Sequence, residues 1–194
     1  MRDDKPVGPG IPSGEEDKAP QAGFSRKVFL DALFLLILAI SASVVYSNTL
    51  TASFHFDDGQ NILENRYIRL EGLSWDGLKD AGFSSHIGSR PVANISFALN
   101  YYVHQYRVEG YHVVNILIHI ITGILLYFFL KTTMQVYRGG VSYDAREASI
   151  LAFIASLVWL VHPIQTQAVT YIVQRMASLA AMFYMLSFLL YVRG

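Results

Sequence analysis

The chain has 194 residues, of which 53% are hydrophobic and only 15% are charged, and its fifteen basic and fifteen acidic residues cancel. Soluble domains carry about 25% charged residues, so this composition indicates an integral membrane protein that contacts the lipid bilayer. The balanced charge argues against a nucleic-acid partner, which needs a basic surface, and the lack of cysteine excludes disulfides and thiolate metal sites.

Residues 1–25 are predicted to form a disordered cytoplasmic tail. They hold four of the six prolines and four of the fourteen glycines, and they lack apolar periodicity. Arg26 and Lys27 then precede an apolar run that is interrupted only by Asp31. This run is long enough to cross a bilayer over about residues 28–48.

A cleaved signal peptide is the alternative interpretation of this first span. Residues 41–43, Ser-Ala-Ser, resemble a small-residue cleavage site. The apolar run is longer than a usual signal-peptide core, and more such runs follow. A membrane anchor is therefore favoured.

Three further apolar segments are predicted to be transmembrane helices, at about residues 109–131, 144–161 and 174–193. Ser142 is expected to cap the third helix, with Asp144 and Glu147 in its first turns, where negative charge suits the helix dipole. Pro163 should end or redirect that helix, because proline cannot continue it.

Positive charge in short loops predicts the orientation. With four spans and a cytoplasmic N-terminus, six basic residues fall on one side: Arg26, Lys27, Lys131, Arg138, Arg146 and Arg193. The opposite side, lumenal or periplasmic, then carries residues 51–110 and the short segment 162–175. We therefore expect a multi-pass protein of a bacterial inner membrane or of an endoplasmic-reticulum-type membrane.

The long outer loop is expected to contain short interfacial helices. Ser74 is placed to cap a helix over SWDGLKDAGF, whose Trp75 and Phe83 suit the membrane interface. Residues 91–104 are apolar with aromatic side chains, so they either lie in the interface or begin the helix that becomes the second span. The predicted fold class is an all-α polytopic membrane protein.

Asp57 and Asp58 are adjacent acidic residues about ten positions after the first span. Neighbouring side chains diverge on a helix or a strand, so only one of them easily faces a given site. One interpretation is a helix N-cap, with Asp57 three residues before Gln60 in a box-like arrangement. The other is a general base at the bilayer surface, where partial desolvation raises its pKa. Both apply if one acid caps and the other reacts.

A polar stripe follows one face of the predicted second span, at His112, Asn115, His119 and Thr122. Polar groups that face lipid lack partners, so this stripe should face the bundle interior or a water-filled cavity. The two histidines are two turns apart, about 10 Å along the axis, so no shared metal ion is expected. Interior packing is the simpler interpretation, and direct ligand binding is the alternative.

Arg90 and Arg175 each precede an apolar helical stretch and are expected at the outer interface. They either snorkel and mark topology or hold the phosphate of a lipid-linked donor, which suits guanidinium geometry. His162 stands directly before Pro163 at the outer end of a span, where helix capping is the structural alternative to a site function.

A family resemblance rests on these residues. Phe56-Asp57-Asp58 resembles the acidic motif of GT-C glycosyltransferases. A wider match runs through RPVANISFALNY (90–101), GYHVVNILIH (110–119) and HPIQTQAVTYIVQR (162–175), followed by SLAAMFYMLSFLLY. This combination is similar to the membrane domain of TMTC-type O-mannosyltransferases, which carry C-terminal tetratricopeptide repeats, and of their bacterial relatives.

The resemblance implies that residues 26–194 are the N-terminal part of a GT-C-like transmembrane domain. It implies an inverting transfer of a sugar, typically mannose, from a polyprenyl-phosphate donor to a protein serine or threonine hydroxyl. By position, Asp57 is the expected base, Asp58 the runner-up or support, and Arg90 and Arg175 the expected donor-phosphate contacts. The expected pocket-lining residues are His112, Asn115, His119 and His162. No metal ligand is predicted, and no cofactor is indicated.

Two departures from the family pattern leave alternatives open. Gln165 and Gln167 stand where family members often carry His and Glu, and an amide cannot act as a base. The GT-C core usually has seven or more spans, whereas four are predicted here, so a fragment, an inactive truncated component or a scaffold is the alternative. A small transporter fits less well, because paired repeats are not found.

Overall fold

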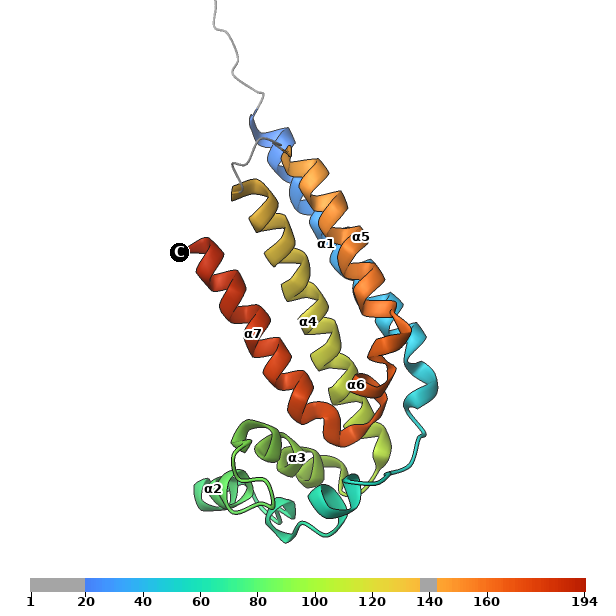
Figure 1. The fold of residues 1–194 in the computed structure, drawn as a ribbon, viewed down its shortest axis with the longest axis vertical. Helices are drawn as coiled ribbons and strands as arrows, with labels where there is room; N and C mark the ends of the chain where they lie inside the picture. Colours follow the sequence, from blue (N-terminus) through green and yellow to red (C-terminus); the bar gives the residue numbers. More distant parts are fainter. Residues whose placement is uncertain (1–19, 137–142) are drawn as a thin grey trace, which may run out of the picture.

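The computed structural model describes residues 20–136 and 143–194, and all regular secondary structure in these residues is helical. This confirms the predicted all-α class. Four long helices run side by side along the molecule, and shorter helices gather at one end of them (Figure 1). The long helices are α1 (Pro20–Val45), α4 (Val108–Val136), α5 (Ala145–Val161) and α7 (Arg175–Arg193).

Three to four segments of the described chain are candidate membrane spans. Val28–Val45, Val108–Val136 and Ile172–Arg193 are each long and apolar enough to cross a bilayer. A fourth span arises if α5 is counted together with Pro163–Thr170, with a bend of 51° between them. Proline at the break explains the bend, since its ring clashes with a continuing helix. A multi-pass membrane protein is therefore supported.

The helix starts differ in two places from the predicted ones. Helix α1 begins at Pro20, within the segment expected to be a tail, and residues 1–19 of that segment lie outside the described residues. The N-cap residue of α5 is Asp144, whereas Ser142 was predicted. Ser142 lies outside the described residues. The Asp144 carboxylate accepts from the Glu147 N–H at 2.8 Å, and the Glu147 carboxylate accepts from the Asp144 N–H at 3.0 Å. This pair is a complete capping box.

Residues 47–107 form a compact unit that we call the helical cap. It contains α2 (Trp75–Phe83) and α3 (Pro91–His104), which lie across the end of α4 and α7 (Figure 1). The Ser74 hydroxyl accepts from the Gly77 N–H at 3.1 Å, so the predicted N-capping of α2 by Ser74 is confirmed.

Helix α3 is separate from α4. It ends at Gln105, whose φ of 50° lies in the left-handed region that residues with a side chain rarely adopt. A new helix then begins at Val108. Of the two interpretations given for residues 91–104, the one in which they begin the second span is therefore wrong.

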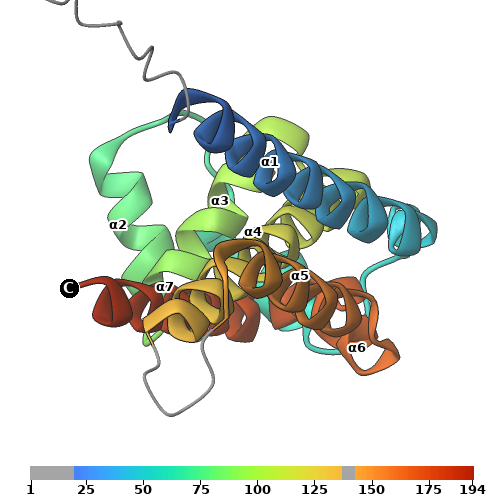
Figure 2. The same ribbon diagram turned by 90° about the horizontal axis from the view of Figure 1, so that it is seen from above.

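Helix α4 is the centre of the bundle and contacts each of the other three long helices. Helices α1 and α5 also contact each other, and the view along the bundle places α4 among its neighbours (Figure 2). The cap is joined to the bundle by a buried apolar cluster that includes Ile62, Ile68, Phe97, Tyr111 and Ile172. This shared core holds the cap against the ends of α4 and α7.

Asp31, the charge inside the first apolar run, is explained by contacts with two other helices. Its carboxylate accepts hydrogen bonds from Tyr127 on α4 and Ser149 on α5 and pairs with Lys131. An ionisable group at this depth is costly unless it is paired. The network therefore ties α1, α4 and α5 together toward the end opposite the cap.

Candidate active site

A tight turn at residues 55–58, which we call the acid turn, presents the two aspartates. Phe56 adopts a φ of 42° and is 92% exposed, so the turn is backbone-strained and open to its surroundings. The Asp58 side chain closes the turn: its Oδ2 accepts from the His55 N–H at 2.9 Å, and its Oδ1 accepts from the Val173 N–H at 2.8 Å. Asp58 therefore tethers the acid turn to the short turn Ile172–Gln174 that directly precedes α7.

Asp58 is buried, with 1% of its surface exposed, and both its oxygens are used by backbone donors. Burial raises the pKa of Asp58, although the two hydrogen bonds and the nearby His55 and His112 oppose the rise. It makes no capping hydrogen bond to the helical turn Gly59–Leu63 that follows.

Asp57 is exposed, and its main chain makes the hydrogen bonds that hold it. Its N–H donates to the Tyr171 hydroxyl at 2.8 Å, and its carbonyl accepts from the Asn61 N–H at 3.0 Å and from the Asn61 amide at 2.9 Å. The proposed capping box between Asp57 and Gln60 is therefore not formed. Of the two aspartates, Asp57 is the one whose carboxylate faces outward.

Tyr171 is a site residue that the sequence analysis missed. Its hydroxyl meets the Asp57 main chain, and its ring packs edge-on against Phe56 with centroids 6.5 Å apart. Burial raises the pKa of Tyr171, and the neighbouring Asp57 and Asp58 charges raise it further, so the hydroxyl keeps its proton. Tyr171 lies in the matched segment 162–175, which was the available signal.

Arg175 is fully buried and enclosed by protein groups. Its Nε donates to the Asn115 side chain at 2.8 Å, its Nη2 to the Tyr111 carbonyl at 2.9 Å, and its Nη1 to the Ser96 carbonyl at 3.2 Å. The guanidinium also lies 4.5 Å from the centre of the Phe97 ring. Arg175 thus joins α3, α4 and the start of α7 instead of facing the membrane interface.

Arg90 has the opposite environment. It is exposed at the start of α3, and its guanidinium makes no hydrogen bond to any residue in the described ranges. It precedes Ser96, a partner of Arg175, by six residues, which is about 9 Å along the helix axis. Arg90 is the arginine of the predicted pair that is free to meet a ligand.

Asn115 connects the polar stripe of α4 to the acid turn. Its amide donates to the carbonyls of Val169, Tyr171 and Ile172 at 3.3 to 3.4 Å, while its oxygen accepts from Arg175. These bonds fix the segment that presents the Val173 N–H and the Tyr171 hydroxyl. Asn115 therefore positions the acid turn without touching it.

The two stripe histidines are both buried but occupy different surroundings. His112 Nε2 donates to the Ala52 carbonyl at 2.9 Å, and its Nδ1 has no partner in the described part of the chain. His119 Nε2 donates to the Leu160 carbonyl at 2.9 Å, and its ring stacks on Trp159. Of the two stripe histidines, His112 is the one close enough to influence the pKa of Asp58.

A cavity of about 170 Å³ lies between α4, α5 and α7. His119, Thr122, Trp159, Gln165 and Ser178 are among its lining residues. His119 is therefore a cavity-lining residue, but this cavity is separate from the acid turn. Gln165, one of the departures from the family pattern, shares the same cavity.

His162 lies at the end of α5 and is exposed. Its Nδ1 accepts from the Ile164 N–H at 3.2 Å, so it starts the short turn Pro163–Gln165. This is the capping arrangement that the sequence left as an alternative. Across residues 20–136 and 143–194, no three His, Asp or Glu side chains are grouped as a metal site.

The chain is similar to several protein O-mannosyl-transferases. It is 31% identical over 167 residues to protein O-mannosyl-transferase F38B6.6 of Caenorhabditis elegans and 30% identical over 172 residues to protein O-mannosyl-transferase TMTC4 of Homo sapiens, with 82% of the chain covered in each case. Protein O-mannosyl-transferase Tmtc3 of Drosophila melanogaster is 27% identical over an alignment 206 positions long, which covers 96% of the chain.

The chain spans 23%, 23% and 22% of the lengths of these three relatives, respectively, which is under a quarter of each. No protein-family model matches the sequence, and no solved structure matches it. The likeness is therefore to one part of larger proteins.

Proposed function

We propose that this chain, most of which is similar to protein O-mannosyl-transferases, is part of a membrane-bound glycosyltransferase. It transfers mannose from a polyprenyl-phosphate donor to a serine or threonine hydroxyl of a protein. The observation that carries the proposal is the outward-facing carboxylate of Asp57, held by main-chain bonds at the cap end of the bundle.

The location of Asp57 suits a donor that is anchored in lipid. A prenyl tail stays in the bilayer, so the reactive carbon of the sugar cannot move far from the interface. The acid turn follows the end of α1 and contacts the start of α7, both of which are candidate spans. A base fixed there is already close to where the reaction takes place, which lowers the entropic cost of bringing the groups together.

The proposed step is a single displacement. The acceptor oxygen attacks the anomeric carbon, the carbon–oxygen bond to phosphate breaks, and the polyprenyl phosphate leaves with the electron pair. The Asp57 carboxylate takes the hydroxyl proton, and the anomeric configuration inverts. The protonated Tyr171 hydroxyl orients this end of the acid turn, and Asp58 is a positioning residue because both its oxygens hold backbone N–H groups.

Arg90 is our candidate for the donor phosphate. Its guanidinium is exposed and free of hydrogen bonds within the described ranges, as a phosphate ligand requires before binding. Arg175 acts through Asn115 and the backbone instead, since its donors already have protein partners. We place the cap and the acid turn on the lumenal or periplasmic side.

An asparagine substitution at Asp57 tests its assignment as the general base. In the full-length protein, Asp57→Asn should lower the rate of transfer from polyprenyl-phosphate mannose by about 100-fold or more, the usual contribution of a general base. Its thermal unfolding should stay close to that of the wild type, because asparagine keeps the main-chain hydrogen bonds of residue 57 to Tyr171 and Asn61. Asp76→Asn, on an exposed side chain of α2, is the matched control and should keep full activity. Full activity in Asp57→Asn would overturn the assignment of the base.

A further inference from the structure

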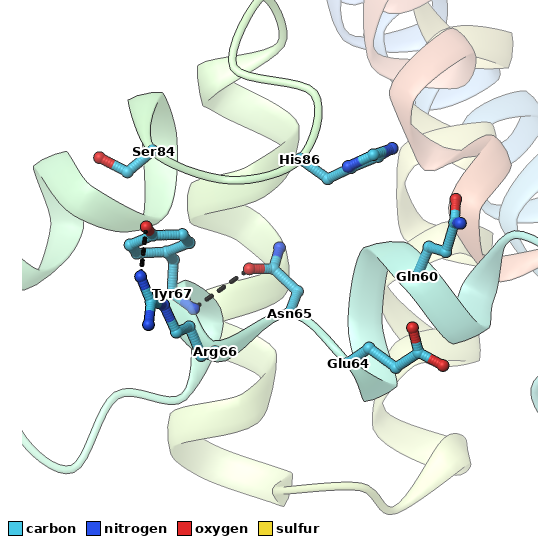
Figure 3. A pocket seen from close by; sticks show the side chains of 7 residues that line it. All are labelled: Gln60, Glu64, Asn65, Arg66, Tyr67, Ser84 and His86. Carbon is cyan, nitrogen blue, oxygen red and sulfur yellow. Dashed lines mark hydrogen bonds between the residues drawn. The ribbon is translucent and has the colours of Figure 1, made fainter.

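A second feature of the cap is a hollow of about 440 Å³ that we call the outer hollow. Its lining residues are Gln60, Glu64, Asn65, Arg66, Tyr67, Ser84 and His86 (Figure 3). They come from two consecutive helical turns after the acid turn and from the chain that follows α2. The volume falls in the range of roughly 300–1,000 Å³ that small-ligand sites occupy.

The frame of the outer hollow is fixed by a buried asparagine. The Asn65 amide donates to the Asn61 carbonyl at 3.1 Å and to the Ser85 hydroxyl at 3.0 Å, and its oxygen accepts from the Tyr67 N–H at 3.1 Å. Ser85 in turn donates to the Ala81 carbonyl at 2.5 Å. These bonds join the three walls, so the hollow exists before any ligand binds.

The rim of the outer hollow carries exposed hydrogen-bonding groups. Gln60, Glu64, Ser84 and His86 are all exposed, and His86 extends toward Gln60 from the far side (Figure 3). Together they offer an amide, a carboxylate, a hydroxyl and an imidazole, which include both donors and acceptors. The walls thus match a ligand that has both kinds of group.

Charge narrows the class of ligand. The lining contains one carboxylate, Glu64, and one guanidinium, Arg66, which is stacked on Tyr67 and donates to its hydroxyl at 2.9 Å. A phosphate is disfavoured, because the Glu64 carboxylate in the same wall offsets the charge of the one guanidinium in the lining. Glu64 and His86 alone do not complete a metal site. A neutral ligand remains, either a polypeptide segment or a sugar.

The position of the outer hollow favours a polypeptide over a sugar as its ligand. Asn61, which holds the Asp57 carbonyl, is flanked by Gln60 of the outer hollow, so the hollow begins one turn beyond the acid turn. The lipid-linked donor approaches from the bilayer, whereas an acceptor protein arrives from water. The hollow lies in the cap and is lined by exposed side chains. Exposed polar side chains such as Glu64 and His86 face water more readily than lipid, so the hollow suits the acceptor.

We infer that the outer hollow is the subsite for the acceptor polypeptide, where Glu64 and His86 bind residues that flank the reacting serine or threonine. This inference rests on the proposed function, because it assumes that the acceptor hydroxyl reaches Asp57. Main-chain amide groups of the acceptor donate to Glu64, and its carbonyl groups accept from His86 and Gln60.

The test measures steady-state kinetics of the full-length protein in lipid nanodiscs. Polyprenyl-phosphate mannose is the donor, and an array of short synthetic peptides, each with one serine or threonine, supplies the acceptor. Glu64→Gln and His86→Ala should each raise the KM for the best peptide about tenfold, as expected for a lost hydrogen bond to a charged or strongly polar group. The KM for the donor and kcat should stay as in the wild type.

Glu71→Gln is the matched control, since Glu71 is exposed in the same cap but does not line the outer hollow. An unchanged peptide KM in both hollow variants would overturn the subsite while leaving the proposed function intact. A higher donor KM instead would assign the hollow to the sugar and overturn the inference. If the wild type modifies no peptide in the array, the proposed function fails, and the subsite fails with it.

A cross-linking experiment gives a readout that does not depend on rate. A photoreactive group placed next to the hydroxyl residue of the best peptide should label residues 84–86, identified by mass spectrometry of the digested protein. A second hollow of the cap, lined by residues 102–107, is the internal comparison. Labelling of 102–107 in place of 84–86 would show that the acceptor lies elsewhere.

Discussion

Asp57 and Asp58 carry the same chemical group, but the structure places them in different surroundings. Asp58 is buried and holds two backbone N–H groups, whereas the Asp57 carboxylate is exposed. An asparagine at position 58 presents an NH₂ group to one of these donors and leaves it unpaired. Asp58→Asn should therefore lower the free energy of unfolding by about 1–3 kcal/mol.

The measurement is thermal unfolding of the purified protein, with Asp57→Asn as the comparison. Asp57→Asn should unfold like the wild type, and Asp58→Asn should unfold earlier. Equal unfolding temperatures for the two variants would contradict the division between base and tether.

The raised pKa of Asp58 leads to a second prediction about a single residue. Burial raises this pKa, so the folded protein binds the proton more tightly than the unfolded chain does. The contribution of Asp58 to stability is then largest below the ordinary aspartate pKa of about 3.9 and declines as pH rises through the raised folded value. In Asp58→Asn this decline should vanish. The check is the free energy of unfolding, measured from acidic to neutral pH in the wild type and in Asp58→Asn. The same dependence on pH in both proteins would refute the prediction.

Arg175 gives a third residue-scale prediction. Its planar guanidinium serves Asn115, Tyr111 and Ser96 at once, and lysine, although charged, cannot reproduce that geometry. Arg175→Lys should release the segment that carries Val173. We expect faster amide hydrogen exchange at residues 169–175 with the α1 amides unaffected, and unchanged exchange would contradict a positioning function.

Sequence reasoning singled out the residues of the candidate site, but it did not predict their contacts. Asp57, Asp58 and Arg175 stand out by type and spacing, but their partners are distant in the chain. Asp58 meets Val173 across 115 positions, and Asp57 meets Tyr171 across 114. Which acid is tethered depends on that tertiary contact, so a single sequence cannot decide it.

At the scale of elements, α2 and α3 present apolar side chains outward. Trp75 is 76% exposed and Phe83 66% exposed on α2, and Val92, Leu99 and Val103 are exposed along α3. Aromatic residues of this kind favour the region of the lipid head groups. We therefore predict that this side of the cap rests on the bilayer.

The chain contains only two tryptophans, which makes this prediction measurable. In Trp159→Phe, Trp75 is the remaining tryptophan of the chain, and its fluorescence can be excited selectively over that of the twelve tyrosines. Lipids brominated near the head group should quench it more strongly than lipids brominated near the end of the acyl chain, with unbrominated lipid as the control. Absence of quenching by either lipid would place the cap in water, away from the membrane.

Helix positions were predictable where a local signal exists. Ser74 precedes α2 and caps it as predicted, because capping depends on a few neighbouring residues. The break between α3 and α4 was left open, because residues 91–104 were assigned either to the interface or to the start of the second span. It occurs at Gln105, which adopts a positive φ without being glycine or proline, so the sequence carries no local sign of the turn.

At the scale of the whole molecule, the four long helices alternate in direction. The chain reaches the cap after α1, leaves it along α4, returns along α5 and leaves again along α7 (Figure 1). The cap and the 162–175 segment therefore meet at one end, where the acid turn joins them through Val173. The sequence predicted this pairing from the count of spans. The packing of the cap onto α4 and α7 required the structure, because it rests on apolar contacts between distant segments.

The orientation of this arrangement decides whether the proposed donor can reach Asp57. The chain has no cysteine, so a single introduced thiol reports its own side of the membrane. Lys79→Cys in the cap and Ile164→Cys after α5 occupy exposed positions, and Val136→Cys is exposed at the opposite end of α4. A membrane-impermeant maleimide added from the lumenal or periplasmic side should label the first two, and should label Val136→Cys only after permeabilisation. Helices α4 and α7 both begin at the cap end of the bundle, so α5 must bring the chain back to that end. Labelling of Lys79→Cys without labelling of Ile164→Cys would therefore mean that α5 does not cross the membrane. The reverse pattern, with Val136→Cys alone labelled, would put the acid turn in the cytoplasm and remove the basis for a donor presented on the outer face.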